Sequence, residues 1–266
     1  MITILLILFL LYVLATRGRT GHPLMAELRK WGYAHRGLHG DGVPENSMAA
    51  FRLALENGYG IELDIHLLAD GNLAVFHDHS LKRTTGADVN IEDLTTEQLP
   101  NYHLEGTEET IPTFSQVLEL FAGKAPMIVE LKPTDENCDQ LAEAACRMLD
   151  HYDGLFCIES FDPRCIRWLM KNRPDFVRGQ LAIYSVPHKT SGVPFKVRFA
   201  LSNLLTNFWN KPDFIAYRFR ERNHLGVRIA RKLWKVQGVS WTLTTKEAYD
   251  TALQEDWIPI FEGFKP

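Results

Sequence analysis

Residues 61–65 of the chain read IELDI, and this short stretch decides which kind of fold to expect. Apolar and charged residues alternate along it, which is the period of a β-strand. Glu62 and Asp64 therefore point to one side of the strand, and Leu63 and Ile65 point to the other. Such a strand needs helices against its apolar face, and its carboxylates must face either solvent or the interior of a barrel.

Short apolar runs recur along the chain and alternate with helical patterns. The runs predict strands over 31–34, 61–66, 127–131, 155–159, 177–181, 214–216, 239–243 and 258–261. Asp70-Gly71 adds a hairpin turn, followed by a short strand over 73–76. Helical patterns lie between strands, over 47–57, 113–121 and 138–150. Eight strands separated by helices favour a (β/α)8 TIM-type barrel over a doubly wound sheet, which no GxGxxG or Walker pattern supports.

The composition is that of an ordinary globular protein. The chain has 266 residues, 45% of them hydrophobic and 23% charged, which excludes a mainly disordered, collagen-like or disulfide-framework protein. The four cysteines form no CxxC pair, so neither a zinc ribbon nor a redox dithiol is indicated, and we expect four reduced thiols, mostly buried. Without an internal repeat or a low-complexity linker, we expect one barrel domain over 31–266.

The N-terminal segment is almost entirely apolar. Residues 2–15 read ITILLILFLLYVLA, and as a helix they would rise about 21 Å, short of the roughly 30 Å hydrocarbon core of a bilayer. A cleaved signal peptide is the alternative, but no Lys or Arg precedes the run. We therefore predict a membrane anchor over 1–20. The nearby positive charges all follow the run, which by the positive-inside tendency puts the catalytic domain in the cytoplasm.

Several predicted strands end in charged residues, although strand interiors prefer apolar ones. In a (β/α)8 barrel these ends meet at one rim, where the active site of such enzymes lies. The expected rim set comprises two histidines, three carboxylates, one arginine and one lysine: His35, His77, Glu62, Asp64, Glu130, Arg36 and Lys132. Each histidine taken alone is more simply explained as structural, so the prediction depends on the whole set.

This rim set suits an anionic phosphoryl substrate. Three carboxylates facing one lumen would repel each other unless a cation lay between them, and oxygen ligands favour Mg²⁺ or Ca²⁺ over zinc. Arg36 and Lys132 can bind phosphate oxygens. Histidine exchanges protons near neutral pH, so His35 and His77 can act as base and acid.

The rim residues stand in a series of short blocks that resembles the glycerophosphodiester phosphodiesterase family. The blocks are AHRG (34–37), PENS (44–47), ELD (62–64), DGNLAVFHD (70–78), LKRTTG (81–86), IPTF (111–114), VELKP (129–133) and WTLT (241–244). They follow the family's order over about residues 31–266, and the first hundred residues of that span carry nearly all of the specificity.

The resemblance implies a (β/α)8 barrel with a small insertion over about 80–110. It also implies one divalent cation on the carboxylates at 62, 64 and 130, an acid–base pair at His35 and His77, and phosphate contacts from Arg36 and Lys132. In the family, a substrate hydroxyl attacks phosphorus and expels the alcohol, and water then opens the cyclic product. The implied reaction is the hydrolysis of glycerophosphodiesters to glycerol 3-phosphate and an alcohol.

A few further positions near the motifs need an interpretation. Asn46 precedes a helical run and is most simply an N-cap, with Glu45 oriented nearby. Trp241, at the end of the seventh strand, either lines the alcohol pocket or packs in the core. Family members commonly end strand eight in isoleucine, threonine and aspartate, whereas this chain has IFE over 260–262, so we expect a different pocket wall there.

The net charge of −4 conceals an asymmetry along the chain. Residues 164–235 carry 16 Lys and Arg against 3 Asp and Glu, whereas residues 1–163 carry 11 against 25. Within the basic stretch, 195–209 has apolar residues at helical spacing, which indicates either an ordinary barrel helix or an interfacial helix on anionic lipid. The anchor and the basic stretch over 189–235 favour a membrane as partner, and no nucleic-acid-binding motif appears in the sequence.

Two enzyme activities remain open on these residues. One is the hydrolysis of soluble glycerophosphodiesters, and the other is a lysophospholipase D activity on membrane lysophospholipids. A non-catalytic membrane scaffold would be expected to have lost part of the rim set, and this set is complete.

Overall fold

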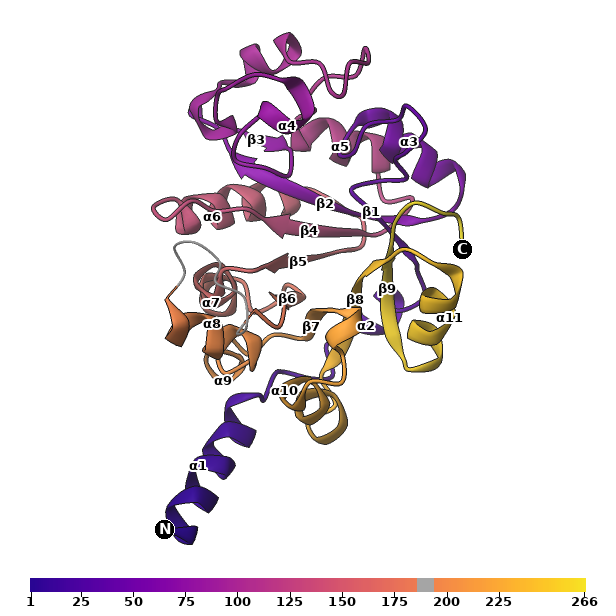
Figure 1. Ribbon diagram of the computed structural model, residues 1–266. Helices are drawn as coiled ribbons and strands as arrows, with labels where there is room; N and C mark the ends of the chain where they lie inside the picture. The colour runs from indigo at the N-terminus through magenta and orange to yellow at the C-terminus, as the bar shows by residue number, and fades with distance from the viewer. Residues whose placement is uncertain (186–193) are drawn as a thin grey trace.

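The computed structural model describes residues 1–185 and 194–266, and a closed ring of eight parallel strands forms its centre (Figure 1). The strands are β1 (Tyr33–His35), β2 (Gly60–Leu67), β4 (Met127–Leu131), β5 (Phe156–Ser160), β6 (Arg178–Ala182), β7 (Phe214–Arg218), β8 (Gln237–Leu243) and β9 (Trp257–Phe261). β1 closes the ring because it pairs with both β2 and β9. The predicted (β/α)8 barrel is confirmed.

Helices connect the strands on the outside of the ring. They are α3 (Met48–Glu56), α5 (Phe114–Phe121), α6 (Cys138–Leu149), α7 (Pro163–Asn172), α8 (Phe195–Ser202), α9 (Asn207–Asn210), α10 (Leu225–Arg228) and α11 (Lys246–Gln254), with shorter turns η3 (Phe219–Glu221) and the π-helix η4 (Ile229–Leu233). The short helix α2 (Met25–Leu28) precedes β1, and its Leu28 packs with apolar residues inside the ring. The expectation of a single helix over 195–209 is wrong. The segment divides into α8 and α9 because Leu204 adopts a φ of 57°, a left-handed conformation that ends a helix.

Apolar side chains form one layer outside the ring and another inside it. Leu63 and Ile65 are fully buried in the outer layer, together with Phe51 and Phe114 of the helices, as the alternation in β2 predicts. The inner layer fills the lumen below the rim with residues such as Phe214. All four cysteines are buried and free, as expected.

A small insertion follows the hairpin strand β3 (Leu73–Val75), which runs antiparallel to β2. It contains α4 (Lys82–Thr85), η1 (Ile91–Asp93) and η2 (Thr96–Asn101). Leu81, Ile91 and Leu99 are buried in a core that belongs to this segment. Because β3 turns back along β2, the residues after it lie beside the end of β2, and His77 thereby reaches the rim.

The N-terminal helix α1 (Ile2–Ala15) projects from the barrel (Figure 1). Its last turn is held to the body, since Trp234 Nε1 donates to the carbonyl of Val13 over 2.8 Å and Tyr12 Oη donates to Asn203 Oδ1 over 3.1 Å. The prediction of a membrane-crossing anchor is not supported. Within the described residues no helix is both long and apolar enough to cross a bilayer, and α1 has 14 residues where about 20 are needed.

Candidate active site

The ends of β2, β4 and β5 place three carboxylates in one row at the rim. Asp64 is in register with Glu130, and Glu130 is in register with Glu159. Glu62, two residues earlier on β2, is in register with His35 of β1. All four carboxylates are buried. Oxygen atoms of the three glutamates lie within 4.8 Å of one another.

Burial and mutual repulsion shift the titration of these groups. Burial, followed by repulsion from Asp64 and Glu130, raises the pKa of Glu62 well above its ordinary value. Burial likewise raises the pKa of Glu159 well above its ordinary value and that of Glu130 to about 7. Burial also acts to raise the pKa of Asp64, but nearby positive charge, foremost Lys132, outweighs it and holds that pKa well below its usual range. The four buried carboxylates outnumber the cationic side chains beside them, Lys132 and Arg36.

The donor set fits a divalent cation. Glu159 Oε2 is buried and has no hydrogen-bond partner among the described residues, and hard cations prefer such carboxylate oxygens. Lys132 Nζ lies 3.1 Å from Asp64 and 2.7 Å from Glu130. Asp64 differs from the glutamates because it also accepts a hydrogen bond of 2.8 Å from Asn46 Nδ2. The geometric group is thus Glu62, Glu130 and Glu159, whereas the sequence predicted Asp64 in place of Glu159. Glu159 could have been found, since it too is a charged residue at a strand end.

Asn46 does not cap α3, so that expectation is wrong. Ser47 is the N-cap, and its hydroxyl accepts a hydrogen bond from the backbone N–H of Ala50. Asn46 instead adopts a φ of 51°, which turns its side chain to Asp64. It therefore orients a carboxylate of the site.

Both rim histidines are held by carboxylates through Nδ1. His35 Nδ1 lies 2.6 Å from Glu262 Oε2, and His77 Nδ1 lies 2.6 Å from Asp78 Oδ1. Nε2 of each ring is the nitrogen left for proton exchange with a substrate. Burial lowers the pKa of His77, and the hydrogen bond with His35 lowers that of Glu262. The sequence associated residues 260–262 with the pocket wall only, but Glu262 contacts His35 directly.

The turn after β1 sets the position of Arg36. Arg36 has a φ of 54° and Gly37 a φ of 82°, and a Cβ at Gly37 would lie 2.8 Å from Ala50 Cβ, so this turn requires glycine. Arg36 Nη1 donates to Glu45 Oε1 over 2.9 Å, and Glu45 also accepts from Arg83 Nη2 over 2.6 Å. Glu45 therefore tethers an arginine that the sequence assigns to phosphate.

A cavity of about 50 Å³ lies among these groups. The predicted residues that line it are His35, Arg36, Glu62, His77, Glu130, Lys132 and Trp241, and Glu159, Phe161, Leu181 and Ile260 complete the wall. Asp64 does not line it. Trp241 packs edge-to-face with Phe161, with ring centroids 5.6 Å apart, and its Nε1 is buried without a hydrogen-bond partner among the described residues. Trp241 thus lines the cavity and also packs against a neighbouring aromatic ring.

Known proteins resemble the chain in sequence and in fold. Residues 35–257 match the model of the Glycerophosphoryl diester phosphodiesterase family. A glycerophosphodiester phosphodiesterase of Bacillus altitudinis is 37% identical over 129 residues, which are 45% of this chain and 52% of the relative. A lysophospholipase D of Homo sapiens is 38% identical over 112 residues, 37% of this chain and 35% of the relative. The chain therefore spans about half or less of the length of these two relatives.

One solved structure supports the fold independently. An Oleispira antarctica phosphodiesterase, determined in complex with the product sn-glycerol-3-phosphate, has a TM-score of 0.71 at 22% identity, and the match covers 87% of this chain and 92% of that one. At this identity the likeness shows a shared barrel. The family match extends over most of that barrel, from the first rim histidine into β9. The chain therefore belongs to the glycerophosphoryl diester phosphodiesterase family.

Proposed function

We propose that the chain is a metal-dependent phosphodiesterase that hydrolyses glycerophosphodiesters to glycerol 3-phosphate and an alcohol. One observation carries the proposal: two histidines, each anchored through Nδ1 by a carboxylate, line the same small cavity as buried glutamates, a lysine and an arginine. Acid–base groups beside a cationic, metal-binding wall are what phosphoryl transfer requires.

In this reaction the two histidines move protons at Nε2. One of them takes the proton of a glycerol hydroxyl as that oxygen forms a bond to phosphorus. The other gives a proton to the alcohol oxygen as its bond to phosphorus breaks. Water then adds to the cyclic phosphate, and the two transfers run in reverse. Arg36 and Lys132 hold the non-bridging oxygens, and the indole of Trp241 faces the alcohol.

A divalent cation completes the proposed site. Glu62, Asp64 and Glu130 would hold it, with Glu159 as a further carboxylate within reach of the group. Mg²⁺ and Ca²⁺ both suit oxygen ligands, and when bound such an ion polarises the phosphoryl group and neutralises its charge.

The test is the release of glycerol 3-phosphate from glycerophosphocholine by the full-length chain. Activity should disappear after chelation and return with Mg²⁺ or Ca²⁺. His35→Ala or Glu62→Gln should lower kcat by about 100-fold or more. His103→Ala, on the exposed surface of the insertion, is the matched control and should leave kcat unchanged. Retention of activity in either site variant would contradict the assignment.

A second candidate is a lysophospholipase D activity at a membrane surface. It is favoured by α1, whose side chains are apolar and exposed. In this case the chain acts on lipid from the cytoplasmic side, because the anionic lipids of that leaflet attract the positive charges that follow the apolar run. Choline release from lysophosphatidylcholine vesicles, measured beside turnover of the soluble diester, separates the two. Turnover of the lipid alone would favour the second candidate.

A further inference from the structure

The helix α1 is apolar on every side and largely uncovered. From Ile4 to Leu11 its side chains are between 51% and 62% exposed, and it contains no charged residue. A helix that is apolar on all sides is normally buried in a protein core or in a membrane. A contiguous exposed apolar surface of this kind marks an interaction site.

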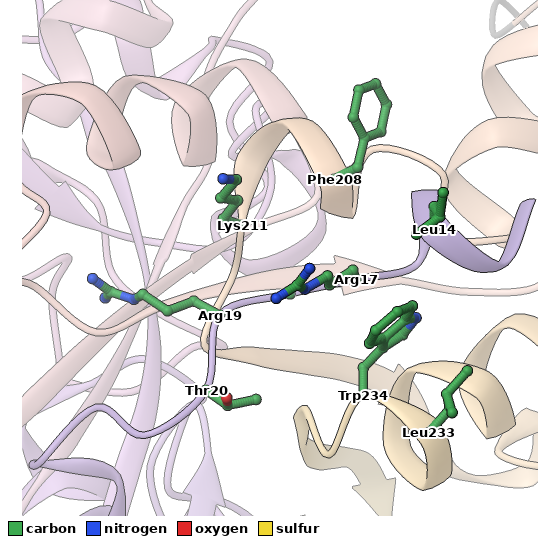
Figure 2. A pocket seen from close by; sticks show the side chains of 9 residues that line it. Leu14, Arg17, Arg19, Thr20, Phe208, Lys211, Leu233 and Trp234 are labelled. Carbon is green, nitrogen blue, oxygen red and sulfur yellow. The ribbon is translucent and has the colours of Figure 1, made fainter. Parts of the chain in front are cut away.

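A cavity of about 610 Å³ opens at the foot of α1 (Figure 2). Leu14 of α1, Phe208, Leu233 and Trp234 form its apolar wall. Its basic residues come from the segment after α1 and from the residue after α9: Arg17, Arg19 and Lys211. Figure 2 shows Arg19 and Lys211 on the side away from α1, so the cavity passes from an apolar end to a basic end.

The three basic residues are not equivalent. Arg19 is neutralised by Asp213, with Nε 2.6 Å from Oδ1. Arg17 and Lys211 have no carboxylate within 4.0 Å among residues 1–185 and 194–266, and the guanidinium of Arg17 lies 5.3 Å from the centre of the Trp234 ring. Two uncompensated cations beside apolar side chains suit a phosphate attached to an apolar molecule.

Exposed apolar side chains surround this cavity. Phe208 is 58% exposed on α9, and Leu233, on η4, is 57% exposed. In a protein that rests on a membrane, aromatic and basic residues lie at the level of the headgroups while apolar ones enter the acyl layer. The foot of α1 has this arrangement.

We propose that the cavity at the foot of α1 binds the phosphate of an anionic phospholipid in a bilayer, with α1 in the apolar layer and Arg17 and Lys211 on the headgroup. The inference deepens the proposed membrane location and rests on it. It is independent of the catalytic site, which lines a different cavity.

The experiment is co-sedimentation of the full-length chain with vesicles of phosphatidylcholine, with and without phosphatidylglycerol. Wild type should bind the anionic vesicles more tightly. The double variant Arg17→Gln with Lys211→Asn should bind them roughly 10- to 30-fold more weakly, and asparagine is chosen because Lys211 has a φ of 43°. The matched control is Arg52→Gln with Lys124→Gln, which also removes two positive charges. Arg52 belongs to α3 and Lys124 follows α5, and these helices lie at the opposite end of the molecule from α1 (Figure 1). This control should bind the vesicles as wild type does.

Each other outcome overturns the inference. Equal loss of vesicle binding in the two double variants would mean that anionic lipid attracts the positive charge of the whole chain and not one site. Equal binding of neutral and anionic vesicles by wild type would mean that the chain contacts the membrane without a headgroup site. Oligomers without vesicle binding would mean that α1 is covered by a second copy. Glycerol 3-phosphate release from glycerophosphocholine, measured on the same preparations, reports the catalytic proposal separately, and the double variant should retain it.

Discussion

Glu262 follows the last strand, β9, and contacts His35 of the first strand, β1. Its Oε2 lies 2.6 Å from His35 Nδ1, and this contact orients the ring. We predict that Glu262→Gln lowers kcat for glycerophosphocholine roughly 10- to 100-fold and alters the pH profile of kcat, with KM little changed. Glu262→Asp should recover part of the loss. Glu247→Gln, exposed on α11, is the control, and an unaltered pH profile in Glu262→Gln would contradict a positioning role.

The carboxyl group of Glu45 makes the free energy of unfolding depend on pH. Burial raises the pKa of Glu45, but Arg83 and Arg36 lower it more, so the value in the folded state lies below the ordinary one. A carboxyl shifted downward stabilises the fold above its ordinary pKa, and this contribution is lost as the pH falls through the folded value. We predict that the free energy of unfolding, from urea titrations between about pH 7 and pH 3, falls less steeply in Arg83→Gln than in wild type. A slope equal to that of wild type would rule out this linkage, and Arg52→Gln is the control.

At the scale of the element, α5 illustrates how a local signal supports the barrel. Thr113 and Gln116 form a capping box, in which the N–H of Gln116 donates to Thr113 Oγ1 over 3.3 Å and the N–H of Thr113 donates to Gln116 Oε1 over 2.8 Å. We predict that Thr113→Ala lowers the free energy of unfolding by about 1 kcal/mol and leaves kcat unchanged. Thr113→Ser keeps the hydroxyl and should unfold as wild type does. Urea titration at neutral pH measures both, and equal stability of the alanine and serine variants would show that the cap contributes little.

At the scale of the whole molecule, the buried glutamates bring charge from three strands to one place. Glu62, Glu130 and Glu159 belong to β2, β4 and β5, and they lie together only in the folded chain. A cation bound there stabilises the folded state selectively. We predict that Mg²⁺ or Ca²⁺ at about 100 times its Kd raises the free energy of unfolding by about 2.7 kcal/mol. Glu62→Gln should lose most of this gain and Glu247→Gln none of it, whereas a thermal midpoint indifferent to the metal would contradict the site.

The residues of each strand determine much about this protein by themselves. Alternation in IELDI and the turn at Asp70-Gly71 are local features, because side-chain direction along a strand depends only on the backbone of neighbouring residues. The strands, the barrel class and most of the cavity wall could therefore be predicted. The run over 2–15 likewise determined a helix of the predicted bounds.

The partners of the site residues follow from contacts between distant parts of the folded chain. Glu262 reaches His35 across 227 positions because β9 closes against β1, and Asn46 turns to Asp64 while Ser47 takes the cap. The cavity at the foot of α1 likewise joins three separate segments of the chain. The physical reason is the same in each case: hydrogen bonds and charges act over a few ångströms in space, and closure of the ring sets those distances.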